Sequence, residues 1–174
     1  DPYHLYPLQT SFGAEVFKRE KSGEYTDELA MGGEQGHQFA EYLADLGKSG
    51  DLRTSMTPDI AKESFIKGDS PYHIAGPWDV AEIEEAGMDV TVLPVPPAGP
   101  EEARPFTGVR AFFVNANAQN PVAAQDFAAN YLTRADAQDS LYESTGRPPA
   151  SKTAIENISD DPLRTSYAEI ATTA

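Results

Sequence analysis

The residues of this chain with the most distinctive chemistry are aromatic side chains placed beside prolines. Tyr3 follows Pro2 in a polar stretch, and Trp78, the only tryptophan, follows the turn Gly76-Pro77. An exposed aromatic face can stack on the C–H face of a sugar ring, while carboxylates and amides bind the sugar's hydroxyls. Composition alone favours core packing for Trp78, and it leaves Tyr3 evenly balanced between the core and a ligand.

Metal and cofactor chemistry has no support in the sequence. His4, His37 and His73 are scattered, and none forms a pair at the spacing of metal ligands. The chain has no cysteine, which excludes disulfides and thiolate metal sites. It also lacks a Gly-x-Ser-x-Gly nucleophile motif and a phosphate-binding loop of the Walker type. We therefore expect no metal site, no cofactor and no nucleophilic catalytic residue.

Acidic residues leave one catalytic possibility open. Two carboxylates flanking a glycosidic bond are the machinery of most glycoside hydrolases, and sequence does not give the distance between them. Carboxylates cluster here at Glu82, Glu84 and Glu85, and in the pairs Glu101-Glu102 and Asp160-Asp161. A solvated surface explains each cluster better, because 28 acidic residues produce such neighbours by chance. A glycan-active hydrolase remains an alternative to a binding protein.

Length and charge limit the class of partner. The chain has 174 residues, of which 40% are hydrophobic, enough for one domain or for parts of two smaller lobes. Its net charge of −15 disfavours nucleic acids and anionic membrane surfaces, which are themselves negatively charged. No apolar run is long enough to cross a bilayer, and no apolar leader precedes Asp1. Because the chain begins without methionine, we expect a processed or excised piece of a longer protein.

Apolar periodicity and turn residues predict alternating helices and short strands, which is the α/β class. A hairpin is expected within 12–25, turning at 21–24, and single strands are expected at 70–75, 88–95 and 109–114. Residues 94–105 form a proline-rich loop. Helices are expected around the apolar stripe Phe39, Leu43 and Leu46, over 78–85 and 134–142, and after the cap-and-proline pairs Thr57-Pro58, Asn120-Pro121 and Asp161-Pro162. In the helix after Thr57, we expect Ile60, Ala61 and Phe65 to form the buried face.

The ordered motifs along the chain resemble those of the maltose- and maltodextrin-binding proteins. Asp1-Pro2-Tyr3 followed by Pro7-Leu8 is similar to the Glu-Pro-Tyr…Pro-Leu segment of that family, and Gly76-Pro77-Trp78 is similar to its Gly-Pro-Trp turn. The separation of the two aromatic residues also matches the family. Further motifs follow in the family's order at 60–68, 90–94, 104–109 and 130–132. Each motif is weak alone, but the ordered set covers nearly the whole chain.

This resemblance implies an extracellular solute-binding protein of an ATP-binding cassette importer, with a type II periplasmic-binding-protein-like fold. Its ligand would be a maltooligosaccharide, its protein partner the membrane permease, and its location the cell surface as a lipoprotein, or the periplasm. In that family two aromatic residues stack on glucosyl rings and an acid binds hydroxyls, and these roles would fall to Tyr3, Trp78 and Asp1. Pro2 and His4 would line the same wall, and the protein would not be an enzyme.

Three residues depart from the family's pattern. Asp1 stands where a longer Glu is usual, His4 where a Phe is usual, and Pro58 where a ligand-contacting Tyr is common. With these departures, the resemblance still implies a glucan-like sugar but does not specify maltose.

The resemblance also implies an incomplete fold, with most of the C-terminal lobe and a segment of the N-terminal lobe. Residues 1–94 and 132–174 would belong to the C-terminal lobe, and residues 95–131 to the other lobe. The strand expected at 109–114 would then lack neighbours and expose an unpaired edge. We expect the chain to compensate by altered packing, or by pairing or swapping strands with another chain.

A third interpretation of the function is a carbohydrate-adhesion module, in which the aromatic residues would be buried.

Overall fold

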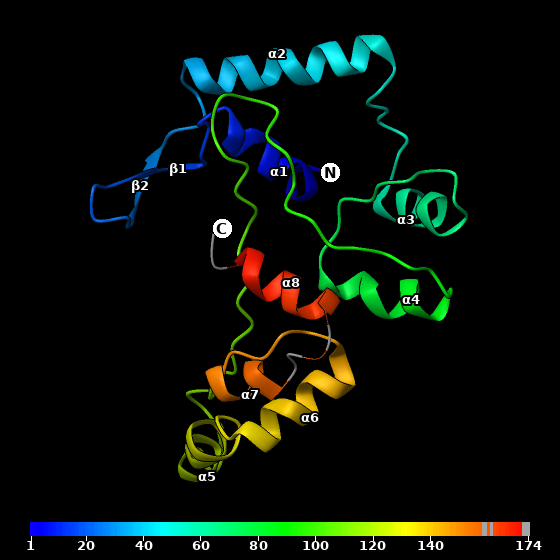
Figure 1. Ribbon diagram of the computed structural model, residues 1–174. Helices are drawn as coiled ribbons and strands as arrows, with labels where there is room; N and C mark the ends of the chain where they lie inside the picture. Colours follow the sequence, from blue (N-terminus) through cyan, green and yellow to red (C-terminus); the bar gives the residue numbers. More distant parts are fainter. Residues whose placement is uncertain (158–159, 161, 172–174) are drawn as a thin grey trace. The chain divides into compact units, whose positions relative to one another are not determined.

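The computed structural model describes residues 1–157, 160 and 162–171, and it divides into two compact units (Figure 1). Unit 1 comprises residues 1–74 and 94–106, and unit 2 comprises residues 75–93 with the described part of 107–173. Each unit therefore joins segments that are far apart in the sequence. The lobe boundaries at residues 94 and 131 remain a prediction.

Unit 1 carries a β-hairpin and the helices that surround it in sequence. Its elements are α1 (Pro2–Ser11), β1 (Phe17–Arg19), β2 (Tyr25–Leu29), α2 (Glu34–Ser49) and α3 (Pro58–Ile66). The two strands are antiparallel, with Phe17 opposite Leu29. The Glu20 N–H donates to the Glu24 carbonyl at 2.8 Å, and Gly23 adopts a φ of 90° in the same turn. The predicted hairpin turn at 21–24 is confirmed.

Capping residues define the helix ends in unit 1. Thr57 accepts a hydrogen bond from the Ile60 N–H at 3.3 Å, and Pro58 occupies the first helical position of α3. α2 ends at Gly50, whose φ of 87° is the left-handed conformation that glycine adopts without strain. Both predicted helices are confirmed. The expectation that Ile60 is buried is wrong, because no residue of α3 is buried and Ile60 is 48% exposed.

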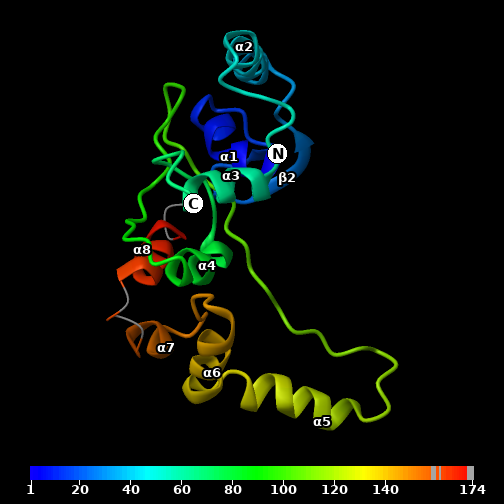
Figure 2. The same ribbon diagram turned by 90° about the vertical axis from the view of Figure 1, so that its right-hand side faces the viewer.

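Unit 2 is helical in its described part. Its elements are a short 3-10 turn η1 (Pro77–Asp79), α4 (Val80–Glu85), α5 (Pro121–Asp126), a π-helical turn η2 (Phe127–Tyr131), α6 (Ala135–Thr145), α7 (Lys152–Asn157) and α8 (Pro162–Ala171). In both views α6 lies beside α7, and α4 lies beside α8 (Figures 1 and 2). The helices predicted at 78–85, 134–142, after Asn120 and from Pro162 are confirmed. Residue 161 and residues 172–174 lie outside the described residues. The short helix α7 was not predicted, because six residues are too few to show a helical period.

The three single strands predicted at 70–75, 88–95 and 109–114 are wrong. Among the described residues, the structure contains one sheet, made of β1 and β2. A strand needs a neighbour to satisfy its backbone hydrogen bonds, and these segments have none. Their apolar side chains are consequently exposed, with Leu93 at 70%, Val109 at 82% and Phe113 at 89%. Whether another chain pairs with 109–114 stays a prediction.

Segment 94–106 of unit 1 lies along α1 and is held there first by Ser11. The Ser11 hydroxyl, which belongs to a fully buried residue, accepts the N–H groups of Ala98 at 3.0 Å and Gly99 at 2.9 Å. The Ser11 carbonyl accepts the Glu101 N–H at 2.8 Å. A Cβ on Gly99 would lie 2.4 Å from the Ser11 carbonyl oxygen, so only glycine permits this approach.

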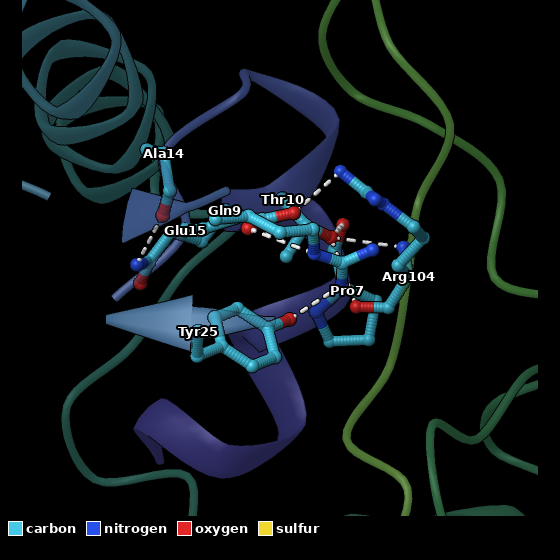
Figure 3. Close-up of polar contacts among 8 residues, drawn as sticks. Pro7, Gln9, Thr10, Ala14, Glu15, Tyr25 and Arg104 are labelled. Atoms are coloured by element: carbon cyan, nitrogen blue, oxygen red, sulfur yellow. Dashed lines mark hydrogen bonds and ion pairs between the residues drawn. The ribbon is translucent and has the colours of Figure 1, made fainter. Parts of the chain in front are cut away.

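Thr10 makes the second attachment (Figure 3). Its hydroxyl oxygen accepts the Arg104 N–H at 2.8 Å. Its hydroxyl hydrogen is shared between the carbonyl oxygens of Pro7 and Arg104, each 2.9 Å away. Because Thr10 is only 2% exposed, water cannot replace these bonds. One threonine therefore fixes the backbone of residue 104 against α1.

We predict that Thr10→Val lowers the free energy of unfolding by about 1–3 kcal/mol, because the shape is kept while the buried Arg104 N–H loses its acceptor. Urea unfolding of the full chain measures this. Thr133→Val is the matched control, since the Thr133 hydroxyl is exposed and bonds only within its own helical turn. Equal stability of the two variants would contradict the role given to Thr10.

Candidate functional site

The first turn of α1 brings four of the five predicted site residues together. Asp1 is the N-cap, and its Oδ1 accepts the Tyr3 N–H at 2.8 Å. Pro2 takes the first helical position, where its missing N–H costs nothing. This is the same cap-and-proline pattern that begins α3. The side chains of Asp1, Tyr3 and His4 therefore project from one helical turn with a fixed backbone.

The Asp1 carboxylate has a second partner within this turn. The Nδ1 atom of His4 lies 3.1 Å from Asp1 Oδ2, which is hydrogen-bonding distance. The His4 side chain is 21% exposed, whereas the Asp1 side chain is 41% exposed. A carboxylate can accept about four hydrogen bonds. Asp1 therefore keeps acceptor capacity for a polar ligand while it caps the helix and orients His4.

Tyr3 is one member of a stack of three aromatic rings, and its ring also meets the His4 ring edge-on, with centroids 5.9 Å apart. The Phe106 ring is parallel to the Tyr6 ring, with centroids 3.7 Å apart and planes inclined by 9°. It also stacks on Tyr3, with centroids 5.2 Å apart and planes inclined by 21°. Tyr6 is 8% exposed, whereas Tyr3 is 45% exposed. The stack therefore runs from a buried tyrosine to a half-exposed one.

The buried end of this stack is Tyr6. Its burial raises the pKa of the Tyr6 hydroxyl, and the nearby Tyr25 and Glu15 raise it further. Tyr6 is therefore neutral at physiological pH and acts as an uncharged platform. It contributes packing and no acid–base chemistry.

An arginine–glutamate cluster supports the same region of unit 1 (Figure 3). Arg104 Nη2 lies 2.7 Å from Glu15 Oε1, and the Glu15 side chain is only 13% exposed. The second oxygen of Glu15 is 3.6 Å from Arg19 Nε, and Arg19 donates to the Tyr25 hydroxyl at 2.6 Å. The charge of Glu15 is thus matched by two guanidinium groups. These contacts link segment 94–106 to the hairpin through Glu15, which lies between α1 and β1.

Trp78, the fifth predicted site residue, lies in unit 2. It occupies the middle of η1 and is 41% exposed. Its indole ring lies directly over Gly76, because a Cβ at that position would be 2.2 Å from the Trp78 Cζ3 atom. Only glycine at residue 76 therefore permits this ring position. Gly76 and Pro77 together set the direction in which the indole points.

The residues that directly follow Trp78 contribute to the small core of unit 2. Asp79, Val80 and Ile83 are all buried. Tyr167 of α8 is near Asp79, and burial, followed by the charge of Asp79, raises the pKa of the Tyr167 hydroxyl. The helix following Trp78 is thus anchored on its inner side, while Trp78 itself is half-exposed.

Sequence reasoning missed two residues and one helix that shape these surfaces. Phe106 belongs to a motif noted in the sequence, but its stacking partners are about a hundred positions away and leave no local signal. Thr10 is a polar residue in a core position, which composition does not reveal. The missed helix α1 did have a signal, since Asp1-Pro2 is a cap followed by proline, although Pro7 within the helix disguises it.

Other kinds of site find no support in the described part of the chain. No group of three or more His, Asp or Glu side chains there is arranged to hold a metal ion. Among these residues, no helix has the length and apolar character needed to cross a membrane.

Comparison with known proteins places these features in a family. The model of a family described as bacterial extracellular solute-binding protein matches residues 3–166. The chain is 27% identical over 160 residues to the maltodextrin-binding protein MdxE of Bacillus subtilis, covering 88% of this chain and 37% of that protein. It is 24% identical over 167 residues to a galactooligosaccharide-binding protein of the same organism, covering 92% and 38%. The chain thus spans about two fifths of the length of these curated relatives.

Solved structures show the same relationship. The maltotriose-binding protein of Thermus thermophilus, bound with maltotriose, matches with a TM-score of 0.80 and 28% identity, over 99% of this chain and 47% of that one. A cyclo/maltodextrin-binding protein complexed with maltotetraose matches with a TM-score of 0.82 and 26% identity, over 99% and 45%. The predicted family and the predicted fold class are therefore confirmed. The chain belongs to the bacterial extracellular solute-binding proteins and has part of their type II periplasmic-binding-protein-like fold.

Proposed function

We propose that this chain forms part of a site for a maltose- or maltodextrin-like oligosaccharide, which the protein delivers to the membrane permease of an ATP-binding cassette importer. The observation that carries the proposal is the first turn of α1. There the half-exposed Tyr3 ring, backed by Phe106, stands beside the Asp1 carboxylate. An aromatic face next to a hydrogen-bond acceptor matches a glucosyl ring, which has apolar C–H faces and hydroxyl groups around its edge.

Within this site, Asp1 and Tyr3 have complementary roles. Tyr3 stacks on the apolar face of one sugar ring, while Asp1 accepts hydrogen bonds from its hydroxyls. Pro2 and His4 line the same wall, and His4 holds the carboxylate in place through the 3.1 Å contact. Because the cap bond already orients Asp1, little of its side-chain freedom is lost on binding.

Trp78 supplies a second stacking surface for the oligosaccharide. Its half-exposed indole at the start of a short helix suits stacking on a sugar ring. We infer that sugar binding favours a closed arrangement of the protein's lobes over an open one, and that the permease responds to this shift. Extracellular or periplasmic location, with a lipid anchor in the first case, follows from the same proposal.

The two alternative functions have less support. The relatives found are solute-binding proteins, which favours a non-catalytic role over a glycan hydrolase. An adhesion module with buried aromatic residues does not fit, because Tyr3 is 45% and Trp78 is 41% exposed. Nucleic acid is disfavoured as a partner by the net charge of −15.

We predict that Tyr3→Leu and Trp78→Leu each raise the Kd for maltotriose by about tenfold or more, since loss of an aromatic anchor commonly costs at least about 1.4 kcal/mol. Isothermal titration calorimetry of the full chain measures the Kd. Tyr72→Leu is the matched control, because Tyr72 is 82% exposed and lies outside both surfaces.

Three results would count against this assignment. Unchanged affinity in both variants would remove the stacking role. Binding of a galactooligosaccharide in place of maltotriose would overturn the sugar class. Release of reducing sugar from maltotriose would favour the hydrolase.

A separate prediction concerns Gly76. Replacement by alanine should displace the indole of Trp78, because the new Cβ would overlap the ring. We expect Gly76→Ala to weaken maltotriose binding to about the extent of Trp78→Leu and to shift the tryptophan emission of the free protein. Gly47→Ala, in the last turn of α2, is the control, since nothing lies within 4 Å of the added Cβ. Full affinity in Gly76→Ala would show that the ring position is not needed for binding.

A further inference from the structure

We propose that Thr10 is a positioning residue for the sugar surface: by fixing the backbone of Arg104, it sets the place at which the Phe106 ring enters the aromatic stack. The neighbouring residue Ser11 holds the same segment without this effect. The consequence for sugar affinity rests on the proposed function. The consequence for the Phe106 ring does not, because it exists without a ligand.

The Thr10 hydroxyl binds both backbone polar groups of Arg104. Its oxygen accepts the Arg104 N–H at 2.8 Å. Its hydrogen is directed to the Arg104 carbonyl oxygen at 2.9 Å, and shared with the carbonyl oxygen of Pro7. Thr10 is only 2% exposed, so water does not compete for these bonds. Two bonds from one hydroxyl therefore fix both the position and the orientation of this part of the backbone.

Little freedom remains between Arg104 and Phe106. Pro105 lies between them, and its ring fixes its own φ and restricts the backbone of the residue before it. The Arg104 guanidinium is also paired with Glu15, with 2.7 Å between Nη2 and Oε1. Because Phe106 is 44% exposed, its place depends on this backbone more than on a surrounding core. A displacement of Arg104 is therefore passed on to Phe106.

The aromatic stack is sensitive to such a displacement. The rings of Phe106 and Tyr6 are in contact, with centroids 3.7 Å apart and planes inclined by 9°. A gap of about 0.5–1 Å already loses about a quarter to a half of the dispersion attraction between two atoms. Tyr3 stacks on the Phe106 ring at 5.2 Å and also meets His4 edge-on at 5.9 Å. Displacement of Phe106 therefore weakens the support of Tyr3 without removing it.

Ser11 provides the matched comparison. It is fully buried, and its hydroxyl accepts the N–H groups of residues 98 and 99 at 3.0 Å and 2.9 Å. These bonds lie several residues before Phe106, whereas Arg104 precedes it by two. Loss of the Ser11 hydroxyl should therefore lower stability but leave Arg104 bonded to Thr10.

The test compares Thr10→Val and Thr10→Ser, which keeps the hydroxyl, with Ser11→Ala in the full chain. Ring-current shifts of labelled Phe and Tyr side chains in the sugar-free protein report the contact between Phe106 and Tyr6, because protons over an aromatic face resonate upfield. We expect upfield shifts in the wild type, in Thr10→Ser and in Ser11→Ala, and their loss in Thr10→Val. Titration with maltotriose should give a Kd about two- to tenfold higher in Thr10→Val, and within about twofold of the wild type in the other two.

Upfield shifts that persist in Thr10→Val would overturn the proposal. Their equal loss in Ser11→Ala would also overturn it, because the segment would then respond to any loss of an attachment. If the wild type fails to bind maltotriose, the proposed function is wrong, while the ring-current shifts still decide the role of Thr10. Thermal unfolding checks that each variant is folded. Thr10→Cys, whose thiol is only a weak hydrogen-bonding group, replaces Thr10→Val if the latter loses its cooperative transition, and the same criteria apply to it.

Discussion

Two adjacent buried hydroxyl groups on α1 hold segment 94–106 of unit 1 in place. Ser11 binds the backbone of residues 98 and 99, and Thr10 binds the backbone of residue 104. A polar side chain in a core is favourable only when its hydrogen bonds are satisfied, and both hydroxyls here are. The α1 helix and segment 94–106 are therefore a single unit, although more than eighty residues separate them in sequence.

This attachment has consequences for the proposed site. Segment 94–106 ends at Phe106, whose ring stacks on Tyr3 and Tyr6. The stacking surface is therefore built from two segments and not from α1 alone. In the same helical turn, the N-cap residue Asp1 provides a carboxylate that accepts hydrogen bonds. In unit 2, the position of Trp78 depends on Gly76, which leaves room for the indole ring. In both units, the position of a half-exposed aromatic ring therefore depends on a backbone conformation that tolerates few substitutions.

The sequence predicted the local features well. Cap-and-proline pairs located α3 and α5, and the turn at 21–24 located the hairpin, because these signals act over a few residues. The family and the fold class are confirmed, while the sugar-binding roles of Tyr3 and Trp78 stay predictions. The predictions of single strands were wrong, since residues 109–114 have the composition of a strand but no strand to pair with among the described residues. The supporting residues Thr10, Ser11 and Phe106 could not be predicted, because their partners are distant in sequence.

The central claim is that the exposed aromatic surfaces bind a glucan. Trp78 is the only tryptophan of the chain, so tryptophan emission reports on this residue alone. Titration of the full chain with maltotriose should give a saturable shift of the emission to shorter wavelength, because the sugar removes water from the indole face. Emission that stays constant up to saturating maltotriose would contradict the claim.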